Sequence, residues 1–375
     1  MIRLLHLGRE INRGDFVDTV LRGVDRTRFF PMAATFGTKA GIADPCFYEA
    51  DIPHTVLNIA TRRDFLSGAR RLAELIRCEK IDIVHAHHLE GMEVASLARI
   101  FASFRLIFGR HYSDAIARIP ARWKRIGYRL LERTLNRTAD AIVSPSTMVH
   151  DLLRGSGVSD SKIFVIPYSF DATKLRSVKA DAVSAVRQEL ASPDRVTIAT
   201  FGRFHPEKGH ADLIEAAAQL SKATRKFRLF LVGDGDEKGR LEKRIEQHGL
   251  QDQVRFLGWR RDVPAIMSAI DVVVQPSHTE CFSQVMLEAL VIGRPLVMTQ
   301  VSGVDDAVTD GRTGLVVRIG DVAGIASALL RLVESAELRS RLGETARQVA
   351  LARYSADKVI PLSEAVYLGL MEHSF

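Results

Sequence analysis

Short apolar runs alternate with longer segments of helical period along the whole chain. Many of these runs are continuous rather than alternating in polarity, which is typical of parallel strands covered by helices on both faces. The segments between them, such as residues 211–223 and 322–334, are long enough for crossover helices. The pattern therefore predicts an α/β protein with two consecutive doubly wound Rossmann-like domains. The expected strands are residues 2–7, 29–36, 54–57, 81–85, 105–108, 141–144 and 163–166 in the first domain and residues 196–201, 227–232, 254–257, 272–275, 295–299 and 314–317 in the second.

The predicted join between the domains lies at residues 167–171, before a polar and weakly patterned stretch at 172–194. We expect an N-terminal domain over residues 1–168 and a C-terminal domain over residues 169–354. A final helical segment, residues 355–375, is expected to pack back on the first domain. Ligands of open α/β sheets bind at the carboxyl ends of the strands, so we expect the two domains to face each other across a cleft.

The composition is that of an ordinary soluble globular protein of 375 residues, with 46% hydrophobic and 26% charged residues. The first ten residues contain charge too early for a signal peptide, and no later run approaches the ~20 apolar residues of a membrane span. Three cysteines, Cys46, Cys78 and Cys281, lie far apart and show no metal-ligand spacing. Sparse cysteines of this kind are typical of reduced thiols, so we expect a cytoplasmic protein.

The net charge of +7 belongs to the first half of the chain. Residues 1–170 hold 25 lysines and arginines against 18 aspartates and glutamates, whereas the remainder is balanced at 27 against 27. An excess of this kind indicates an anionic partner. No zinc-finger or RNA-binding motif accompanies it. We therefore expect no nucleic acid, but an anionic membrane surface or an acidic acceptor.

Residues 118–137 predict a basic amphipathic helix with Pro120 in its first turn. Its apolar stripe consists of Trp123, Ile126, Leu130 and Leu131, with arginines around it. Such a helix can lie on anionic lipid, which would make the protein peripheral on the inner face of the plasma membrane. Alternatively, the stripe packs on the first sheet and the arginines are solvated. We expect packing for the stripe, and lipid or an anionic acceptor for the charge.

A glycine-framed loop follows the first strand of the second domain, at residues 201–209. Gly202 permits a tight turn, and Gly209 lets the backbone close on the start of the next helix. Arg203 and Lys208 place two cations beside that helix N-terminus, whose free N–H groups already favour phosphate. A lone cation would more often be solvated, but this pair indicates a diphosphate site.

Two glutamates follow the fourth strand of the second domain. Ser283 is a good N-cap, so Glu280 is expected in the loop before a helix and Glu288 in the second turn of that helix. A loop carboxylate accepts hydrogen bonds from sugar hydroxyls, and a half-buried helical carboxylate needs donors such as the two hydroxyls of a ribose. Each glutamate alone could instead interact with the helix dipole or lie on the surface. Their position beside the 201–209 loop favours a shared site.

These motifs resemble those of the family-4 retaining glycosyltransferases, also called glycosyl transferases group 1, which have the GT-B fold. The resemblance runs over most of the chain and is strongest over residues 197–317. The most specific feature of the family is a pair of glutamates with seven residues between them, matched by Glu280 and Glu288. Its Gly-Arg-x-x-x-x-Lys-Gly loop, Val-Gly-Asp-Gly turn, Phe-Leu-Gly and Asp-Gly-x-x-Gly are matched by residues 202–209, 232–235, 256–258 and 310–314.

The resemblance implies a metal-independent hexosyltransferase that moves a sugar from a UDP- or GDP-sugar to the hydroxyl of a glycan or lipid-linked acceptor. Envelope polysaccharide or glycolipid synthesis is the expected process, and no cofactor is expected. Arg203 and Lys208 would bind the diphosphate, Glu280 the sugar hydroxyls and Glu288 the ribose. In the first domain His111 follows a strand and is the candidate acceptor-side residue. The expected catalytic residues are His111, Arg203, Lys208 and Glu280, and the expected donor-binding residues are Gly14, Gly202, Arg203, Lys208, Gly233, Phe282, Ser283 and Glu288.

Several positions depart from the family pattern. Gly14 is the one plausible match to the usual Gly-Gly pair of the first loop, and Arg13 adds charge beside it. Cys281 and Ser283 stand where relatives usually have glycine, and Asp306 stands where they more often have glutamate. These departures bear on the identity of the donor and the shape of the sugar pocket more than on the class of enzyme.

Two clusters raise the alternative of a bound metal. His85 and His87 share one face of a strand, with His88 next to them, but no carboxylate motif completes the site. Residues 234–236, Asp-Gly-Asp, resemble the metal motif of a different glycosyltransferase fold, but they lie in a turn after a strand. We therefore expect no metal, and a polar acceptor pocket around the histidines.

Three other functions are compatible with parts of the sequence. A nucleotide-sugar epimerase of the same fold would act on the donor without an acceptor. A dinucleotide-dependent oxidoreductase is disfavoured, because Lys238 stands where the third glycine of Gly-x-Gly-x-x-Gly would follow Gly233 and Gly235. A non-catalytic nucleotide-sugar-binding relative is compatible with the altered first loop, although both glutamates and both phosphate cations remain.

Overall fold

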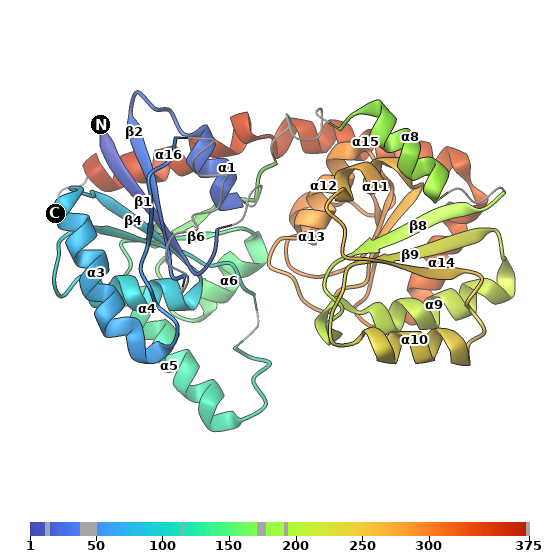
Figure 1. Cartoon of the computed structure of the whole chain (residues 1–375), viewed down its shortest axis with the longest axis horizontal. Coiled ribbons are helices and arrows are strands. Elements are labelled where there is room, and N and C mark those ends of the chain that lie inside the picture. Colours follow the sequence, from blue (N-terminus) through green and yellow to red (C-terminus); the bar gives the residue numbers. More distant parts are fainter. Residues whose placement is uncertain (12–15, 38–50, 114–115, 171–177, 191–193, 373–375) are drawn as a thin grey trace. The chain divides into compact units, whose positions relative to one another are not determined.

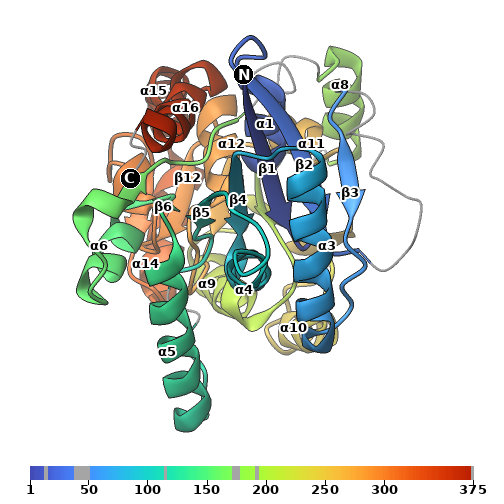
Figure 2. The same cartoon turned by 90° about the vertical axis from the view of Figure 1, so that its left-hand side faces the viewer.

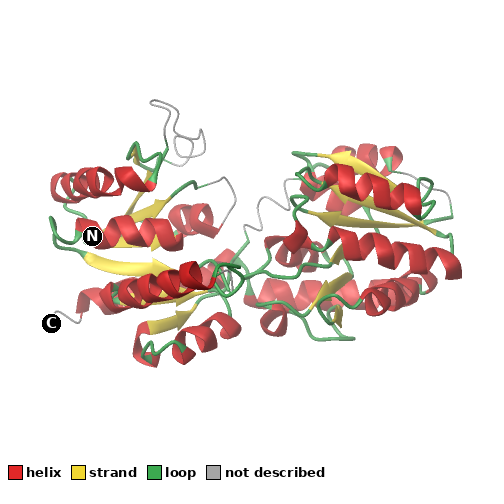
Figure 3. Ribbon diagram, turned by 90° about the horizontal axis from the view of Figure 1, so that it is seen from below, coloured by secondary structure: helices red, strands yellow, loops and turns green. Residues whose placement is uncertain are grey.

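The computed structural model describes residues 1–11, 16–37, 51–113, 116–170, 178–190 and 194–372. The chain forms two compact units, shown in Figure 1. Unit 1 contains residues 1–170 and 356–375, and unit 2 contains residues 171–355. In each unit a parallel sheet lies between helices (Figure 3). The predicted strands are all present, which confirms two Rossmann-like sheets.

The sheet of unit 1 has seven strands in the order β3-β2-β1-β4-β5-β6-β7, and all neighbouring strands are parallel. The order reverses between β1 and β4, so these two strands form the topological switch point at which such sheets bind ligands. The strands are β1 (Ile2–Gly8), β2 (Phe29–Thr35), β3 (His54–Val56), β4 (Ile83–His87), β5 (Arg105–Gly109), β6 (Ala141–Ser144) and β7 (Ile163–Val165).

Two helices cover one face of this sheet, α1 (Phe16–Gly23) and α16 (Ala356–Glu372). The last helix of the chain contributes Val359, Val366 and Tyr367 to the core of unit 1. On the opposite face α4 (His88–Ala98) approaches so closely that a Cβ at Gly91 would lie 3.3 Å from the carbonyl oxygen of Leu7. The remaining helices of unit 1 are α3 (Phe65–Cys78), α5 (Arg122–Thr138) and α6 (Thr147–Gly155), with the short 3-10 turns η1 (Arg62–Asp64) and η2 (Asp160–Lys162).

The sheet of unit 2 has six parallel strands in the order β10-β9-β8-β11-β12-β13. Its switch point lies between β8 and β11. The strands are β8 (Val196–Phe201), β9 (Phe227–Val232), β10 (Val254–Gly258), β11 (Val272–Gln275), β12 (Leu296–Thr299) and β13 (Leu315–Val317).

Helices α9 (His210–Ala223), α10 (Lys238–Gln247) and α14 (Val322–Glu334) share one hydrophobic core with the sheet of unit 2. Three further helices of unit 2 are α8 (Ala180–Glu189), α11 (Val263–Ala269) and α12 (Gln284–Ile292). Helix α11 contacts both α8 and α12 (Figure 1). The stretch 172–194 was expected to be weakly patterned, yet it contains α8. The other helical elements are η3 (Pro206–Lys208), α13 (Val304–Ala307) and α15 (Ala336–Arg353).

The predicted basic helix of the first domain is α5, which begins at Arg122, after Pro120 rather than around it. The prediction that its apolar stripe packs on the sheet is wrong for its first turns. Trp123, Ile126 and Leu130 are 73%, 48% and 57% exposed. This end of α5 extends beyond the rest of unit 1 in both views (Figures 1 and 2). Among the described residues, no element of unit 1 covers this stripe.

Gly209 joins η3 to α9 with a left-handed backbone, φ 68°. A Cβ added there would lie 1.9 Å from the carbonyl oxygen of Pro276, in the loop that follows β11. Glycine is therefore required at this position for two reasons, its positive φ and the close approach of a second loop.

We expect Gly209→Ala to destabilise unit 2 much more than Gly249→Ala. Gly249 has a similar φ of 63°, but nothing lies within 4 Å of its Cβ position. Gly249→Ala should cost about 1 kcal/mol of backbone strain. Gly209→Ala carries the same strain and also displaces a loop, so its cost should be larger by about 2 kcal/mol or more. Urea unfolding of the two variants measures the difference, and equal losses would contradict the close approach.

Candidate active site

Two loops of unit 2 meet at the carboxyl ends of β8 and β11. These strands are neighbours, with Val272 opposite Ile198 and Val273 opposite Ala199. The loop after β8 contains the predicted diphosphate residues, and the loop after β11 contains Glu280. The backbone N–H of His278 donates to the carbonyl oxygen of Glu207 at 2.7 Å, which fastens the second loop to the first.

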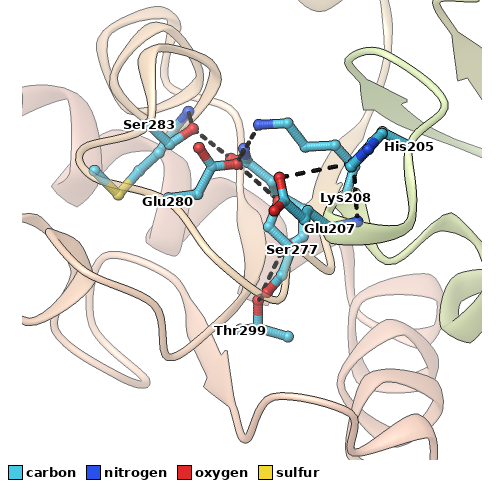
Figure 4. A network of polar contacts seen from close by, with 9 residues as sticks. His205, Glu207, Lys208, Ser277, Glu280, Ser283 and Thr299 are labelled. Atoms are coloured by element: carbon cyan, nitrogen blue, oxygen red, sulfur yellow. Dashed lines mark hydrogen bonds and ion pairs between the residues drawn. The ribbon is translucent and has the colours of Figure 1, made fainter. Parts of the chain in front are cut away.

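Lys208 and Glu280 lie in direct contact (Figure 4). Nζ of Lys208 donates to Oε1 of Glu280 at 2.6 Å, and the glutamate side chain is only 12% exposed. Oε1 also accepts from Nε2 of Gln275 at 3.1 Å and from Oγ of Ser277 at 2.8 Å. The other carboxylate oxygen, Oε2, makes no hydrogen bond within the residues that the structure describes. Glu280 is therefore fixed in place through Oε1, and Oε2 remains available to accept a hydrogen bond from a ligand.

Sequence reasoning missed Gln275 and Ser277 as site residues. Gln275 ends the otherwise apolar strand β11 and is buried, and Oε1 of its amide accepts from Oγ of Ser283 at 2.8 Å. The amide thus joins Ser283 to Glu280. Its signal in the sequence was a long polar side chain directly after three valines, Val272–Val274.

The glutamate spacing has the local structure that the sequence predicts. Ser283 is the N-cap of α12, and its Oγ accepts from the backbone N–H of Met286 at 3.2 Å. Glu280 lies in the loop ahead of the helix, and Glu288 lies in its second turn and is partly buried. The ring of Phe282, in contrast, is buried in unit 2, 5.8 Å from the ring of Tyr354. Phe282 can therefore meet a donor only through its backbone.

The remaining predicted donor residues are placed as follows. Arg203 is exposed and has no ion pair within the described part of the chain. Gly202 and Gly233 lie back to back, since a Cβ at Gly233 would be 1.9 Å from the carbonyl oxygen of Gly202. Gly14 lies outside the described residues.

The Asp-Gly-Asp turn at residues 234–236 closes over the first loop. The carbonyl oxygen of Asp234 accepts from the backbone N–H of Phe204 at 2.8 Å, and its Oδ1 accepts from the N–H of Gly235 at 2.9 Å. These bonds account for Asp234 as a turn residue.

In unit 1 four histidines share one face of the sheet around β1, β4 and β5. His6 of β1 stands opposite His85 of β4, and His87 stands opposite Gly109, two residues before His111. Nδ1 of His6 and Nε2 of His87 are 2.9 Å apart, and Nδ1 of His87 and Nε2 of His111 are 2.7 Å apart. His6, His85 and His87 are fully buried.

His111, the candidate acceptor-side residue, has both ring nitrogens engaged. Nε2 pairs with His87, and Nδ1 is 2.8 Å from the hydroxyl oxygen of Tyr168. A neutral imidazole has one donor and one acceptor, so each hydrogen bond of this series fixes the tautomer of the next histidine. His111 can contact a ligand through nitrogen only when one of its two bonds opens.

Burial keeps these histidines neutral. It lowers the pKa of His6 to about 3. Burial first, and the neighbouring histidines second, hold the pKa values of His85, His87 and His111 well below their usual range. Neutral imidazoles are also the form that binds metals.

The structure adds a third histidine to the pair considered for a metal. Ring nitrogens of His6, His85 and His87 lie within 4.8 Å of one another. The sequence alone could not predict that His6 lies beside this pair, because His6 belongs to a strand about 80 positions away in the chain. However, the ring planes of His6 and His87 are nearly parallel, 17° apart, and Nδ1 of His6 lies at hydrogen-bond distance from Nε2 of His87. This geometry favours a hydrogen bond between the two rings rather than a shared ion.

Comparison with known families accounts for most of the chain. Residues 184–349 match the family model described as glycosyl transferases group 1, and residues 19–169 match the one described as glycosyl transferase 4-like domain. The D-inositol 3-phosphate glycosyltransferase of Corynebacterium jeikeium is 30% identical over 285 residues, which are 71% of this chain and 67% of that protein.

A second relative is the lipopolysaccharide core biosynthesis glycosyltransferase LpsE of Rhizobium meliloti. It is 35% identical over 178 residues, 47% of this chain, and the match spans about half of the relative's length, 51%. Among solved structures, Anabaena HepE in complex with UDP-glucose has a TM-score of 0.83 at 22% identity, with 98% of this chain and 100% of that chain covered. This likeness, together with the two Rossmann-like sheets, shows the GT-B fold.

We expect unit 1 to lose stability steeply below pH 6.5. The four histidines of its cluster, His6, His85, His87 and His111, are neutral when folded but protonate near pH 6.5 in the unfolded chain. Because the folded pKa values are depressed, the stabilisation is complete above pH 6.5 and falls as the pH decreases, by up to about 5 kcal/mol per pH unit.

Unit 2 provides an internal control, since among its described residues one buried histidine, His210, has a pKa lowered to about 4. Its slope should be roughly a quarter as steep. Hydrogen-exchange mass spectrometry in urea at pH 7.5, 6.5 and 5.5, compared between peptides of β4 and β8, measures both slopes. Parallel slopes in the two units would contradict the neutral state of the cluster.

Proposed function

Because the chain belongs to the group 1 glycosyltransferases of the GT-B fold, we propose that it transfers a sugar from a nucleoside-diphosphate sugar to an acceptor hydroxyl, with retention at the anomeric carbon. The observation that carries the proposal is the contact of Lys208 with Glu280 at the switch point of unit 2. A cation and an anchored carboxylate there can bind the two parts of such a donor, its diphosphate and its sugar.

The diphosphate is proposed to bind at the loop after β8. Arg203 is exposed and without an ion pair among the described residues, and Lys208 stands one residue before the N-cap of α9. Phosphate oxygens can accept from both cations and from the first N–H groups of α9. As the sugar leaves, negative charge grows on the diphosphate, so these groups stabilise the transition state more than the ground state.

The sugar is proposed to contact Glu280 through Oε2. Because Oε1 already accepts from three donors, the carboxylate cannot rotate freely and its second oxygen has a fixed direction. A fixed acceptor orients sugar hydroxyls without loss of side-chain entropy at the time of binding. Glu288, in the second turn of α12, is proposed to bind the ribose. HepE was solved with UDP-glucose, which supports a UDP-hexose as the first donor to test.

The acceptor is proposed to be a glycan or a lipid-linked sugar on the unit 1 side, with His111 as the acceptor-side residue. Its hydrogen bonds to His87 and Tyr168 hold a neutral ring, which suits orientation of a hydroxyl rather than its deprotonation. The departing phosphate can take the proton of the acceptor. No step of this scheme needs a metal ion, so we propose a metal-independent reaction.

We also propose that α5 places the protein on an anionic membrane surface. Its exposed residues Trp123, Ile126 and Leu130 follow one another at helical spacing. Its one acidic residue, Glu132, is buried and paired with Arg110 at 3.0 Å. The exposed charge of α5 is therefore entirely positive, which is the pattern of an interfacial helix. Among the described residues no helix is both long and apolar enough to cross a membrane.

The first test compares Lys208→Ala with Lys222→Ala, a change at an exposed lysine near the C-terminal end of α9. Lys208→Ala should lower the rate of transfer from UDP-glucose to a glycan acceptor by about a hundredfold or more, because it removes a charge that stabilises the leaving group. Lys222→Ala should transfer at the wild-type rate. Transfer by Lys208→Ala at the wild-type rate would show that the diphosphate binds elsewhere.

Two further measurements in this assay separate the alternatives. With donor alone, an epimerase would convert the sugar and a glycosyltransferase would only hydrolyse it slowly. EDTA should leave the transfer rate unchanged. Loss of transfer activity after chelation would refute metal independence. A protein that binds UDP but never transfers would be a non-catalytic relative.

For the membrane surface, we expect Arg122→Gln with Arg129→Gln to weaken binding to phosphatidylglycerol vesicles by about tenfold or more, at roughly 1 kcal/mol per arginine. The matched control removes two exposed charges from α10, Arg240→Gln with Lys243→Gln, and should bind like wild type. Vesicle sedimentation measures both variants. Equal weakening by the two pairs would indicate a general charge effect and not a surface on α5.

A further inference from the structure

Unit 1 contains a small polar pocket that the proposed reaction does not use. It lies where the C-terminal end of α5 meets the loop between α6 and η2, and its volume is about 290 Å³. The pocket is lined by Arg133, Asn136, Arg137, Ser156, Gly157, Val158, Ser159 and Lys162. Three of these residues are cations and none is a carboxylate.

The three cations have no acidic partner among the residues that the structure describes. Neither Arg133 nor Arg137 has an ion pair within the described residues, and Nζ of Lys162 donates to the carbonyl oxygen of Ala139 at 3.0 Å, which is neutral. Three positive groups around one pocket repel one another, and an anion between them would turn that repulsion into attraction. Two acidic residues are adjacent in sequence to lining residues, and both have partners outside the pocket. Glu132 pairs with Arg110 at 3.0 Å, and the exposed Asp160 lies 3.4 Å from Nε2 of His150.

Asn136 gives independent support for a ligand. It is 4% exposed, and neither its amide nitrogen nor its amide oxygen has a hydrogen-bond partner among the described residues. A buried amide without partners costs free energy, so such groups normally meet a ligand or water. The amide nitrogen can donate to an anionic oxygen, and the amide oxygen can accept from a hydroxyl.

We propose that this pocket binds a hydroxyl-bearing phosphate group, such as a phosphoglycerol or a sugar phosphate. Arg133, Arg137 and Lys162 surround its phosphate, and Asn136 bonds to both the phosphate and the adjacent hydroxyl. The hydroxyls of Ser156 and Ser159 line the same pocket and add further donors. The group can belong to a soluble molecule or to the headgroup of an anionic lipid, and both present the same chemistry.

The test is a calorimetric titration of the full-length protein with glycerol 1-phosphate. The informative variant is Asn136→Leu, which keeps every cation and the approximate side-chain volume but removes both amide atoms. It should weaken glycerol 1-phosphate binding at least tenfold. Its stability without ligand should be equal to or above that of wild type, because an unpartnered amide is replaced by an apolar group.

Two further variants keep the proposal testable if Asn136→Leu does not fold. Arg137→Gln at the rim should weaken binding by a similar factor. Arg63→Gln, at an exposed position of η1 that does not line the pocket, should stay within twofold of wild type. Equal affinity in wild type and Asn136→Leu would overturn the proposal. The proposal would also be overturned if the wild type did not bind glycerol 1-phosphate at about 10 mM, because an affinity weaker than this is too low for a specific site.

A second experiment, with lipid vesicles, shows whether the phosphate belongs to a lipid or to a soluble molecule. If Asn136→Leu weakens sedimentation with phosphatidylglycerol vesicles, with phosphatidylcholine vesicles as the baseline, the ligand is a lipid headgroup. If it weakens glycerol 1-phosphate binding alone, the ligand is soluble. The α5 surface keeps all its arginines in this variant, so neither result depends on the membrane proposal or on transfer activity.

Discussion

The order of the parallel strands decides where polar chemistry can gather in this protein. Carboxyl ends of parallel strands share one edge of a sheet, and where the strand order reverses the loops on either side diverge and leave room between them. In unit 2 the reversal between β8 and β11 brings Lys208 onto Glu280, although 72 positions separate them in the chain. In unit 1 the reversal between β1 and β4 brings His6 to His87, 81 positions away.

The two switch points differ in whether their polar side chains are charged or neutral. In unit 2 the charged pair is partly exposed, with side-chain exposures of 31% for Lys208 and 12% for Glu280, so the charges stay available to a ligand. In unit 1 His6, His85 and His87 are fully buried, and burial keeps their imidazoles neutral. A charged site for the proposed donor and a neutral side for the proposed acceptor would suit a reaction in which charge develops on a departing diphosphate.

The positive charge of unit 1 lies on its surface instead. It is concentrated on α5 and at the end of that helix, away from the buried histidines. The first turns of α5 combine exposed apolar side chains with arginines, and its last turn lines the pocket around Asn136. Part of the excess of cations in the first half of the chain thus lies on the proposed membrane surface, and part lines the proposed phosphate pocket.

The sequence by itself determined the thirteen strands, the crossover helices and the local structure of the glutamate loop, because each rests on a short-range pattern. Continuous apolar runs specify buried parallel strands, and the hydroxyl of Ser283 specifies a helix start three residues ahead of Met286. The same reasoning placed Glu280 and Glu288 correctly on loop and helix.

Only the tertiary structure decided which distant residues meet and which faces stay uncovered. Nothing local shows that Gln275 and Ser277 donate to Glu280, or that His6 joins His85 and His87, because these contacts depend on strand order and loop path. The stripe of α5 has the same pattern whether it packs on a sheet or remains exposed. Its exposure depends on what the rest of the fold places beside it, and no pattern within residues 118–137 contains that information.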